Sequence, residues 1–108
     1  MANNLIFRAA DASMSNSTIS ADPTSVEVGT QSTVTVNLLD DSGLPVDQAS
    51  VEIGVTGGNL LGIPLNTGNG NYVVSWLAPT TAGSYTASFL VNGVEFPRKV
   101  TLNAVPGV

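Results

Sequence analysis

Residues Gly70–Val91, GNYVVSWLAPTTAGSYTASFLV, contain the strongest indication of the fold. Apolar side chains recur at every second position in two segments, 71–77 and 84–91, and a period of two is typical of a half-buried β-strand. Pro79 and Gly83 bracket a short turn between the two segments. Four of the six aromatic residues lie here, so most of the large core side chains do too. The pattern predicts a hairpin that carries half of the core of a β-sandwich.

Four large side chains of this stretch are interpreted as core markers. Tyr72 and Trp76 share one face of the first strand, and Tyr85 and Phe89 share one face of the second. Trp76 is interpreted as a buried anchor and not as a platform for a ligand, because aromatic side chains dominate core energetics. The Gly83-x-Tyr85 motif fits a tyrosine corner, in which the hydroxyl donates to upstream backbone. A plain core tyrosine is the alternative interpretation.

Further strands are predicted on both sides of this stretch. Segment 31–39 shows the clearest alternation, with Val36 on its apolar face and β-branched neighbours that favour a pleated surface. A turn follows at Asp40–Pro45, where Asp and Ser bond local backbone, Gly accepts a positive φ and Pro45 stops strand pairing. The other predicted elements are strands at 17–21, 26–28 and 49–56, an irregular edge strand at Leu60–Leu65, a turn at 66–71, a hairpin turn at Asn92-Gly93, and a last strand at 94–104 bulged at Pro97.

The pattern comprises seven to eight short strands, separated by turns, without helical periodicity. It predicts an all-β fold, namely an immunoglobulin-like Greek-key sandwich of seven to eight antiparallel strands. The fold markers of this prediction are Val36, Pro45, Tyr72, Trp76, Gly83, Tyr85 and Phe89.

Composition narrows the classes of function. The chain has 108 residues, enough for one domain, and only 10% of them are charged, with a formal net charge of −5. Only three residues are basic, which argues against a nucleic-acid partner and against binding to an anionic membrane surface. No run of apolar residues is long enough to insert into a membrane. The sequence has neither His nor Cys, so it lacks the commonest general base and metal ligand and all thiol chemistry.

Two groups of carboxylates are candidates for a functional site by residue type. Asp40, Asp41 and Asp47 cluster around one turn, and with backbone carbonyls they could bind calcium, but they lack the ligand spacing of a calcium loop. Capping of the turn is therefore preferred. The three glutamates, at positions 27, 52 and 95, lie on separate predicted strands and are explained as solvated outer residues. No metal site is predicted.

Nucleophiles and glycine-rich segments give no catalytic constellation either. The serines have no His and no evident Lys as an activating base. Gly57-Gly58 and Gly68-Asn69-Gly70 do not precede a helix and a Lys, as a phosphate-binding loop would require. The prediction is a protein that is not an enzyme, with no catalytic residues, no cofactor-binding residues and no cofactor.

The segment Ser17–Val51, STISADPTSVEVGTQSTVTVNLLDDSGLPVDQASV, resembles the opening of a bacterial immunoglobulin-like repeat of the invasin/intimin type. The family's Asp-x-x-Gly-x-Pro-Val turn is matched by Asp40, Gly43, Pro45 and Val46. The later spacing of Gly70-x-Tyr72, Pro79 and Gly83-x-Tyr85 is similar both to this family and to filamin-type repeats. The resemblance covers roughly residues 17–104 and implies a module without catalytic activity.

Three regions are expected from these observations. Residues 1–16 form an N-terminal arm or the junction from a preceding repeat, since residues 5–13 resemble the last strand and junction of such a repeat. Within this region, Leu5–Ala9 is expected to form a short strand or an arm. A frayed terminus is the alternative. Residues 17–104 form the immunoglobulin-like sandwich. Residues 105–108 form a C-terminal tail.

The resemblance implies a structural or adhesion module that is part of a larger chain at the bacterial cell surface. Its role would be that of a rod spacer or a protein-binding repeat of an adhesin. The alternative is a stand-alone accessory protein, a decoration or tail protein, of a phage virion, which a Met1 without a signal peptide favours. A third hypothesis is a module that accepts a partner's strand along the edge at Leu60–Leu65. The expected partners are proteins: neighbouring repeats, and a host-surface protein or a capsid or tail protein.

Overall fold

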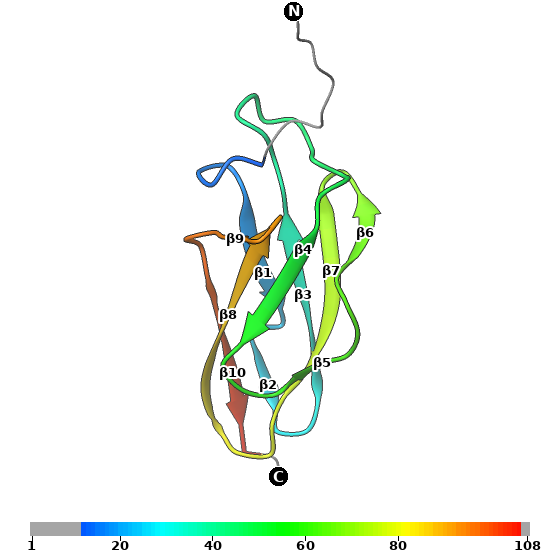
Figure 1. Cartoon of the computed structure of the whole chain (residues 1–108). Helices are drawn as coiled ribbons and strands as arrows, with labels where there is room; N and C mark the ends of the chain where they lie inside the picture. The colour runs from blue at the N-terminus through cyan, green and yellow to red at the C-terminus, as the bar shows by residue number, and fades with distance from the viewer. Residues whose placement is uncertain (1–11, 107–108) are drawn as a thin grey trace, which may run out of the picture.

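The computed structural model describes residues 12–106, and these residues form ten strands in two five-stranded sheets packed face to face (Figure 1). In the first sheet the order is β1-β3-β7-β5, with β6 also paired to β7; in the second it is β2-β10-β8-β4, with β9 also paired to β8. No helix among these residues is long and apolar enough to cross a membrane. The strands are β1 Thr18–Asp22, β2 Ser25–Glu27, β3 Gln31–Asn37, β4 Val51–Val55, β5 Asn59–Leu60, β6 Leu65–Gly68, β7 Asn71–Leu77, β8 Gly83–Val91, β9 Val94–Glu95 and β10 Val100–Val105.

The prediction of an all-β, immunoglobulin-like sandwich is confirmed, with differences in detail. The structure has ten strands because short paired segments such as β5 and β9 count separately. One pair, β2 with β10, is parallel. It is parallel because the chain leaves the first sheet after β1, at Asp22-Pro23, and continues as β2 along the edge of the second. A proline at this point suits a break in pairing, since it has no amide to donate to a ladder.

The predicted hairpin between β7 and β8 is wrong, although both strands are where the alternation placed them. β7 pairs with β3, whereas β8 pairs with β4 and β10, so the two strands belong to opposite sheets. Residues 78–82 therefore cross from one sheet to the other. The apolar faces of β7 and β8 face each other across the sandwich instead of lying side by side. Alternation identifies which face of a strand is buried, but it does not identify the neighbouring strand.

Three other predicted boundaries also need correction. The edge strand Leu60–Leu65 is not continuous: β5 ends at Leu60, β6 begins at Leu65, and the four residues between them are outside any strand. The predicted turn at 66–71 shrinks to Asn69-Gly70, because β6 extends to Gly68 and pairs with β7. The last strand is interrupted and not merely bulged at Pro97, since β9 and β10 are separated by residues 96–99.

The two ends of the described chain lie at opposite ends of the sandwich (Figure 1). At one end the Ser13 amide donates to the Leu39 carbonyl oxygen, just after β3 (2.7 Å). At the other end the Val28 amide donates to the Val105 carbonyl oxygen, just before β3 (2.9 Å). The seven residues of β3 lie between these contacts, and at about 3.3 Å per residue they span roughly 23 Å. The predicted strand or arm at 5–9 and the end of the predicted tail, 107–108, lie outside the described residues.

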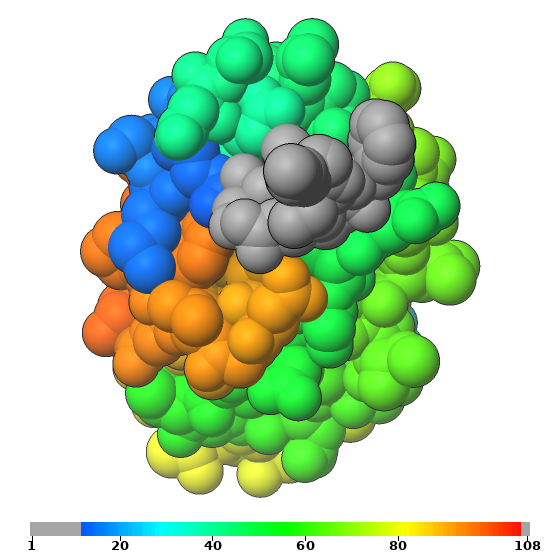
Figure 2. Space-filling view, turned by 45° about the horizontal axis from the view of Figure 1, so that its top comes forward, coloured from blue at the N-terminus to red at the C-terminus, as the bar shows by residue number. Residues whose placement is uncertain are grey.

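Residues near the described N-terminus pack against the sandwich. Figure 2 shows them (blue) at one end of the molecule with the loop after β3 (teal) and the β8–β9 hairpin (orange). The Asn16 side-chain amide donates to the Asp40 carbonyl oxygen (3.0 Å), and the Arg98 guanidinium donates to the Ser15 carbonyl oxygen (2.9 Å). Ser17 is fully buried, and its hydroxyl bonds the Leu39 backbone. These contacts attach residues 13–17 to the end from which the chain enters.

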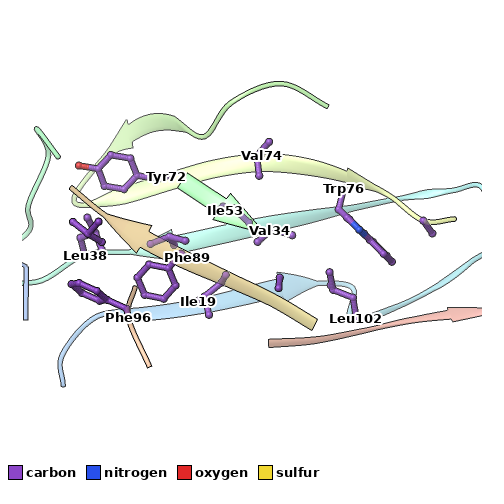
Figure 3. Close-up of a cluster of buried hydrophobic side chains, with 14 of the residues drawn as sticks. Ile19, Val34, Leu38, Ile53, Tyr72, Val74, Trp76, Phe89, Phe96 and Leu102 are labelled. Atoms are coloured by element: carbon purple, nitrogen blue, oxygen red, sulfur yellow. The ribbon is translucent and has the colours of Figure 1, made fainter. Parts of the chain in front are cut away.

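The core is one continuous cluster of apolar side chains between the sheets (Figure 3). β7 contributes every second residue, and β8 contributes its own alternating set from the opposite sheet. Full burial of large side chains is concentrated in these strands and their sheet neighbours. The largest fully buried apolar side chains are Trp76, Phe89, Leu38, Leu102, Val34 and Val36.

Candidate functional surfaces

Trp76 and Tyr85 form an aromatic pair that rests on two glycines. Their ring centroids are 6.1 Å apart, and Trp76 comes from the first sheet while Tyr85 comes from the second. The indole N–H of Trp76 donates to the Gly57 carbonyl oxygen (2.9 Å). A Cβ on Gly57 would overlap the Tyr85 ring, and one on Gly58 would lie 2.6 Å from Trp76 Nε1. The Gly57-Gly58 pair, which the sequence only excluded as a phosphate loop, therefore provides the space for these rings.

The tyrosine corner is present at Tyr85. Its hydroxyl donates to the carbonyl oxygen of Thr81, four residues upstream (2.6 Å). Gly83 begins β8, close to the Tyr85 ring. The bond fixes the crossing from one sheet to the other where the chain enters β8, and this is a structural role.

The Tyr72 hydroxyl also forms hydrogen bonds with backbone groups, a role that the sequence did not indicate. Its ring is buried, and its hydroxyl donates to the Val46 carbonyl oxygen (2.7 Å) and accepts from the Ala49 amide (3.2 Å). The tyrosine thereby fixes the connection into β4. Pro45, at the start of this connection, is exposed and forms an isolated bridge with Leu39. Among the other fold markers, Val36 and Phe89 are fully buried.

The acidic residues around the Asp40–Pro45 turn bond backbone and side-chain amides. Asp40 Oδ1 accepts from the amides of Ser42 (2.8 Å) and Leu44 (2.9 Å), which is the turn capping that the sequence favoured. Asp47 Oδ1 accepts from the Gly70 amide (2.6 Å) and so ties this loop to the β6–β7 turn. Among residues 12–106, no group of three or more acidic side chains is arranged to hold a metal ion.

The glutamates lie apart on exposed positions of three different strands. Glu27 is on β2, at one edge of the second sheet, and Glu52 is on β4, at the other. The structure does place Glu52 and Glu95 on either side of Leu90, because β4 and β9 flank β8 at that residue. Two strand spacings separate them, about 10 Å. Both side chains are exposed, without the enclosed cleft in which a carboxylate pair would act on a substrate.

A shallow hollow of about 500 Å³ on the outer face of the second sheet brings a lysine near hydroxyl groups. Lys99 lines it together with Ser88, Thr56 and Thr86. The lysine is exposed, and an ammonium group in water is not the desolvated base that serine activation requires. The hollow therefore lacks a nucleophile paired with a base.

The arrangement defines an immunoglobulin-type sandwich module, in which two sheets pack face to face and the chain changes sheet between β1 and β2. Comparison with known families assigns it more closely. The family model described as Invasin, domain 3 matches residues 13–107, and the chain belongs to this family. The predicted likeness to invasin/intimin-type repeats is thus confirmed.

Solved structures of adhesins are similar to this chain. The adhesin InvE of Yersinia pseudotuberculosis is 29% identical with a TM-score of 0.84, over 91% of this chain and 28% of that one. Invasin, a bacterial integrin-binding protein, is 30% identical with a TM-score of 0.82, over 94% of this chain and 21% of that one. The chain thus spans less than a third of the length of either adhesin.

The expected likeness to filamin-type repeats is also found. The filamin domain of Lin-41 is 25% identical with a TM-score of 0.69, over 93% of this chain and all of that one. No match is found among curated protein sequences. The comparisons support a module of the bacterial adhesin type, and they do not bear on the virion alternative, which stays a prediction.

Proposed function

We propose that this chain is a non-catalytic module of a bacterial surface adhesin and acts as a rod spacer between neighbouring repeats. Membership of the invasin domain 3 family and the similarity to InvE support this function. The proposal extends to a protein partner, because the invasin structure is that of an integrin-binding protein. Residues 1–16 are then the junction with a preceding repeat, and residues 17–104 the repeat itself.

The observation that carries the proposal is the separation of the two ends of the described residues, 12 and 106. The chain enters beside Leu39 and leaves beside Val28, at opposite ends of β3. Copies joined through these ends extend in a line, because each copy adds its long dimension to the chain. The segment that precedes β1 is attached to the sandwich, since Ser13, Ser15 and Asn16 form hydrogen bonds with it. Such bonds would limit bending at the junction.

Small-angle X-ray scattering on two copies of the full chain fused end to end tests this geometry. We expect a maximum dimension close to twice that of a single copy and a narrow distribution of distances. A matched fusion with a flexible Gly/Ser linker between the copies is the control, and it should give a broader distribution. A directly fused pair that is as compact as one copy, or as broad as the linker control, would contradict a spacer role.

A further inference from the structure

The second sheet has an uncovered edge at β4. In the order β2-β10-β8-β4, β4 is the last strand, and β8 is its only neighbour among the described residues. The opposite edge of the same sheet is formed by β2, which has three residues, whereas β4 has five. Exposed edges are usually protected by charge, proline or short length. β4, with the sequence VEIGV, has no proline, and Glu52 is its one charged residue.

The backbone groups on this edge can be assigned from the pairing with β8. Ser50 accepts from the Asn92 amide (2.7 Å), and the Thr56 amide donates to Thr86 (3.0 Å). Hydrogen-bonding residues alternate along an antiparallel strand, so the even-numbered positions of β4 point toward β8. The amide and carbonyl groups of Val51, Ile53 and Val55 then point away from β8, toward the open edge.

A groove lined by both apolar and polar residues lies beside the same edge. It has a volume of about 470 Å³ and lies between the start of β4 and the segment 60–64. Three large apolar side chains next to or within this segment are exposed: Leu61 (47%), Ile63 (85%) and Leu65 (67%). Of these three, Ile63 lines the groove. Single exposed apolar residues are ordinary, but three within five residues beside a free strand edge suit an interaction surface.

We propose that the β4 edge binds the β4 edge of a second copy of this chain, antiparallel across a two-fold axis centred on Ile53. In this register Ile53 pairs with Ile53 of the other copy, and Val51 pairs with Val55. The outward-pointing groups of these three residues then form hydrogen-bonded pairs, and the two second sheets become one continuous sheet. This interface does not depend on the spacer function proposed above.

A second copy fits this edge because the strand is complementary to itself. Glu52 and Gly54 lie one position to either side of Ile53, so each Glu52 faces a Gly54 and not another Glu52. These are non-hydrogen-bonded pairs, in which opposing side chains are closest and like charges would repel most. A chain with a net charge of −5 therefore meets its copy at an edge where the register keeps the two carboxylates apart.

The exposed apolar residues support the same arrangement. In a continuous sheet the core-facing sides of both copies point the same way, so the two 60–64 segments lie beneath the paired strands and face each other. Ile63, 85% exposed in the single chain, then has an apolar neighbour in the other copy. Burial of these side chains adds to the backbone pairing.

The register gives a test by charge at one position. Gly54 is exposed, has no left-handed φ, and a Cβ there would meet only Ser88 Oγ at 3.8 Å, so its replacement should leave the fold intact. Gly54→Glu places a second carboxylate opposite Glu52 in both symmetric pairs, whereas Gly54→Lys places an ammonium group there. We expect roughly tenfold weaker dimerisation for the first and roughly tenfold tighter for the second.

The measurement is sedimentation equilibrium of the full chain and both variants over a wide concentration range, with thermal unfolding as the check on folding. The doubly substituted chain Glu52→Lys/Gly54→Glu exchanges the charges and should dimerise more tightly than Gly54→Glu alone. Raising the salt concentration should reduce the differences between the dimerisation constants of the variants, because these charges are at the surface and are screened.

Three outcomes would overturn the proposal. One is a parent chain that stays monomeric at the highest concentration. Another is a dimer whose strength is the same for Gly54→Glu and Gly54→Lys, since it uses another surface. The third is protection of the Ile53 amide from exchange in a dilute monomer, which would show that the edge is covered by another segment of the same chain.

Discussion

Strands β7 and β8 and the segment around β5 and β6 both carry many apolar residues, but the side chains of the two regions have opposite surroundings. In β7 and β8 every second side chain points across the sandwich, and Trp76 and Phe89 are fully buried. Between β5 and β6 the large apolar side chains point outward, and Ile63 is 85% exposed. The alternation of a strand gives the first pattern, and a segment broken by Gly62 and Pro64 gives the second.

The difference separates residues that hold the fold from residues available to a partner. Apolar side chains in β7 and β8 contribute to stability through burial in one chain. Those near Ile63 contribute nothing comparable to a single chain, because they stay in contact with water. Substitutions should therefore divide into two groups, with large effects on unfolding in the first region and effects on association in the second.

Trp76→Ala should give the largest loss of stability. The side chain is fully buried and its indole N–H bonds the Gly57 carbonyl oxygen, so truncation leaves a cavity and an unpaired acceptor. We expect the free energy of unfolding to fall by about 3–5 kcal/mol in urea titrations. A loss below about 1 kcal/mol would mean that the aromatic pair is not an anchor of the core.

Gly58→Ala should give the second-largest loss of stability, and Gly29→Ala is its matched control. Both glycines have φ of +77°, but a Cβ on Gly58 would meet the Leu77 carbonyl oxygen at 2.5 Å, whereas one on Gly29 would meet nothing within 4 Å. We expect about 1 kcal/mol of backbone strain at Gly29, and about 1–3 kcal/mol more at Gly58 from the forced contacts. Equal losses in the two variants would remove the packing argument for Gly57-Gly58.

Removal of the buried Tyr72 hydroxyl should cost more stability than removal of the exposed Tyr85 hydroxyl. Tyr72→Phe removes a buried hydroxyl that bonds both Val46 and Ala49, and we expect a loss of about 1–3 kcal/mol. Tyr85→Phe removes an exposed bond to Thr81, and we expect about 0.5–1 kcal/mol. Chemical unfolding of both variants measures the difference, and a larger loss at Tyr85 would reverse the ranking.

Ile63→Ser should have the smallest effect on the single chain. Because this side chain is 85% exposed, the free energy of unfolding of the monomer should change by no more than about 0.5 kcal/mol. Dimerisation in sedimentation equilibrium should weaken, since the apolar contact between copies is lost. A destabilised monomer would show that Ile63 packs within its own chain.

Much of the fold could be predicted from the sequence because alternation is a local property. The bounds of β7 were predicted to the residue, and the bonding role of Tyr85 followed from its place after Gly83. The pairing of strands was not predictable in the same way. β7 and β8 are separated by five residues, and such a connection can close a hairpin or cross to another sheet.

The roles of polar and glycine residues depended on contacts between distant segments. Asp47 bonds the Gly70 amide, 23 residues away, and the Tyr72 hydroxyl bonds Val46, 26 residues away. Neither pair has a spacing that marks it in the sequence. The predicted edge at Leu60–Leu65 is found, since among residues 12–106 β5 and β6 pair only with β7 at the end of the first sheet. The edge of the second sheet at β4 was not predicted, because the alternation of β4 gave no sign that one side lacks a neighbour.

Residue-resolved amide hydrogen exchange at two protein concentrations tests the contrast between these regions most directly. The amide of Val74, in the centre of β7, should be strongly protected at both concentrations, because β7 has neighbours on both sides. The Ile53 amide should exchange rapidly in dilute protein and slowly in concentrated protein, as the second copy covers the edge. An Ile53 amide that exchanges at the same rate at both concentrations, while Val74 stays protected, would contradict the division between a closed core and an edge used for association.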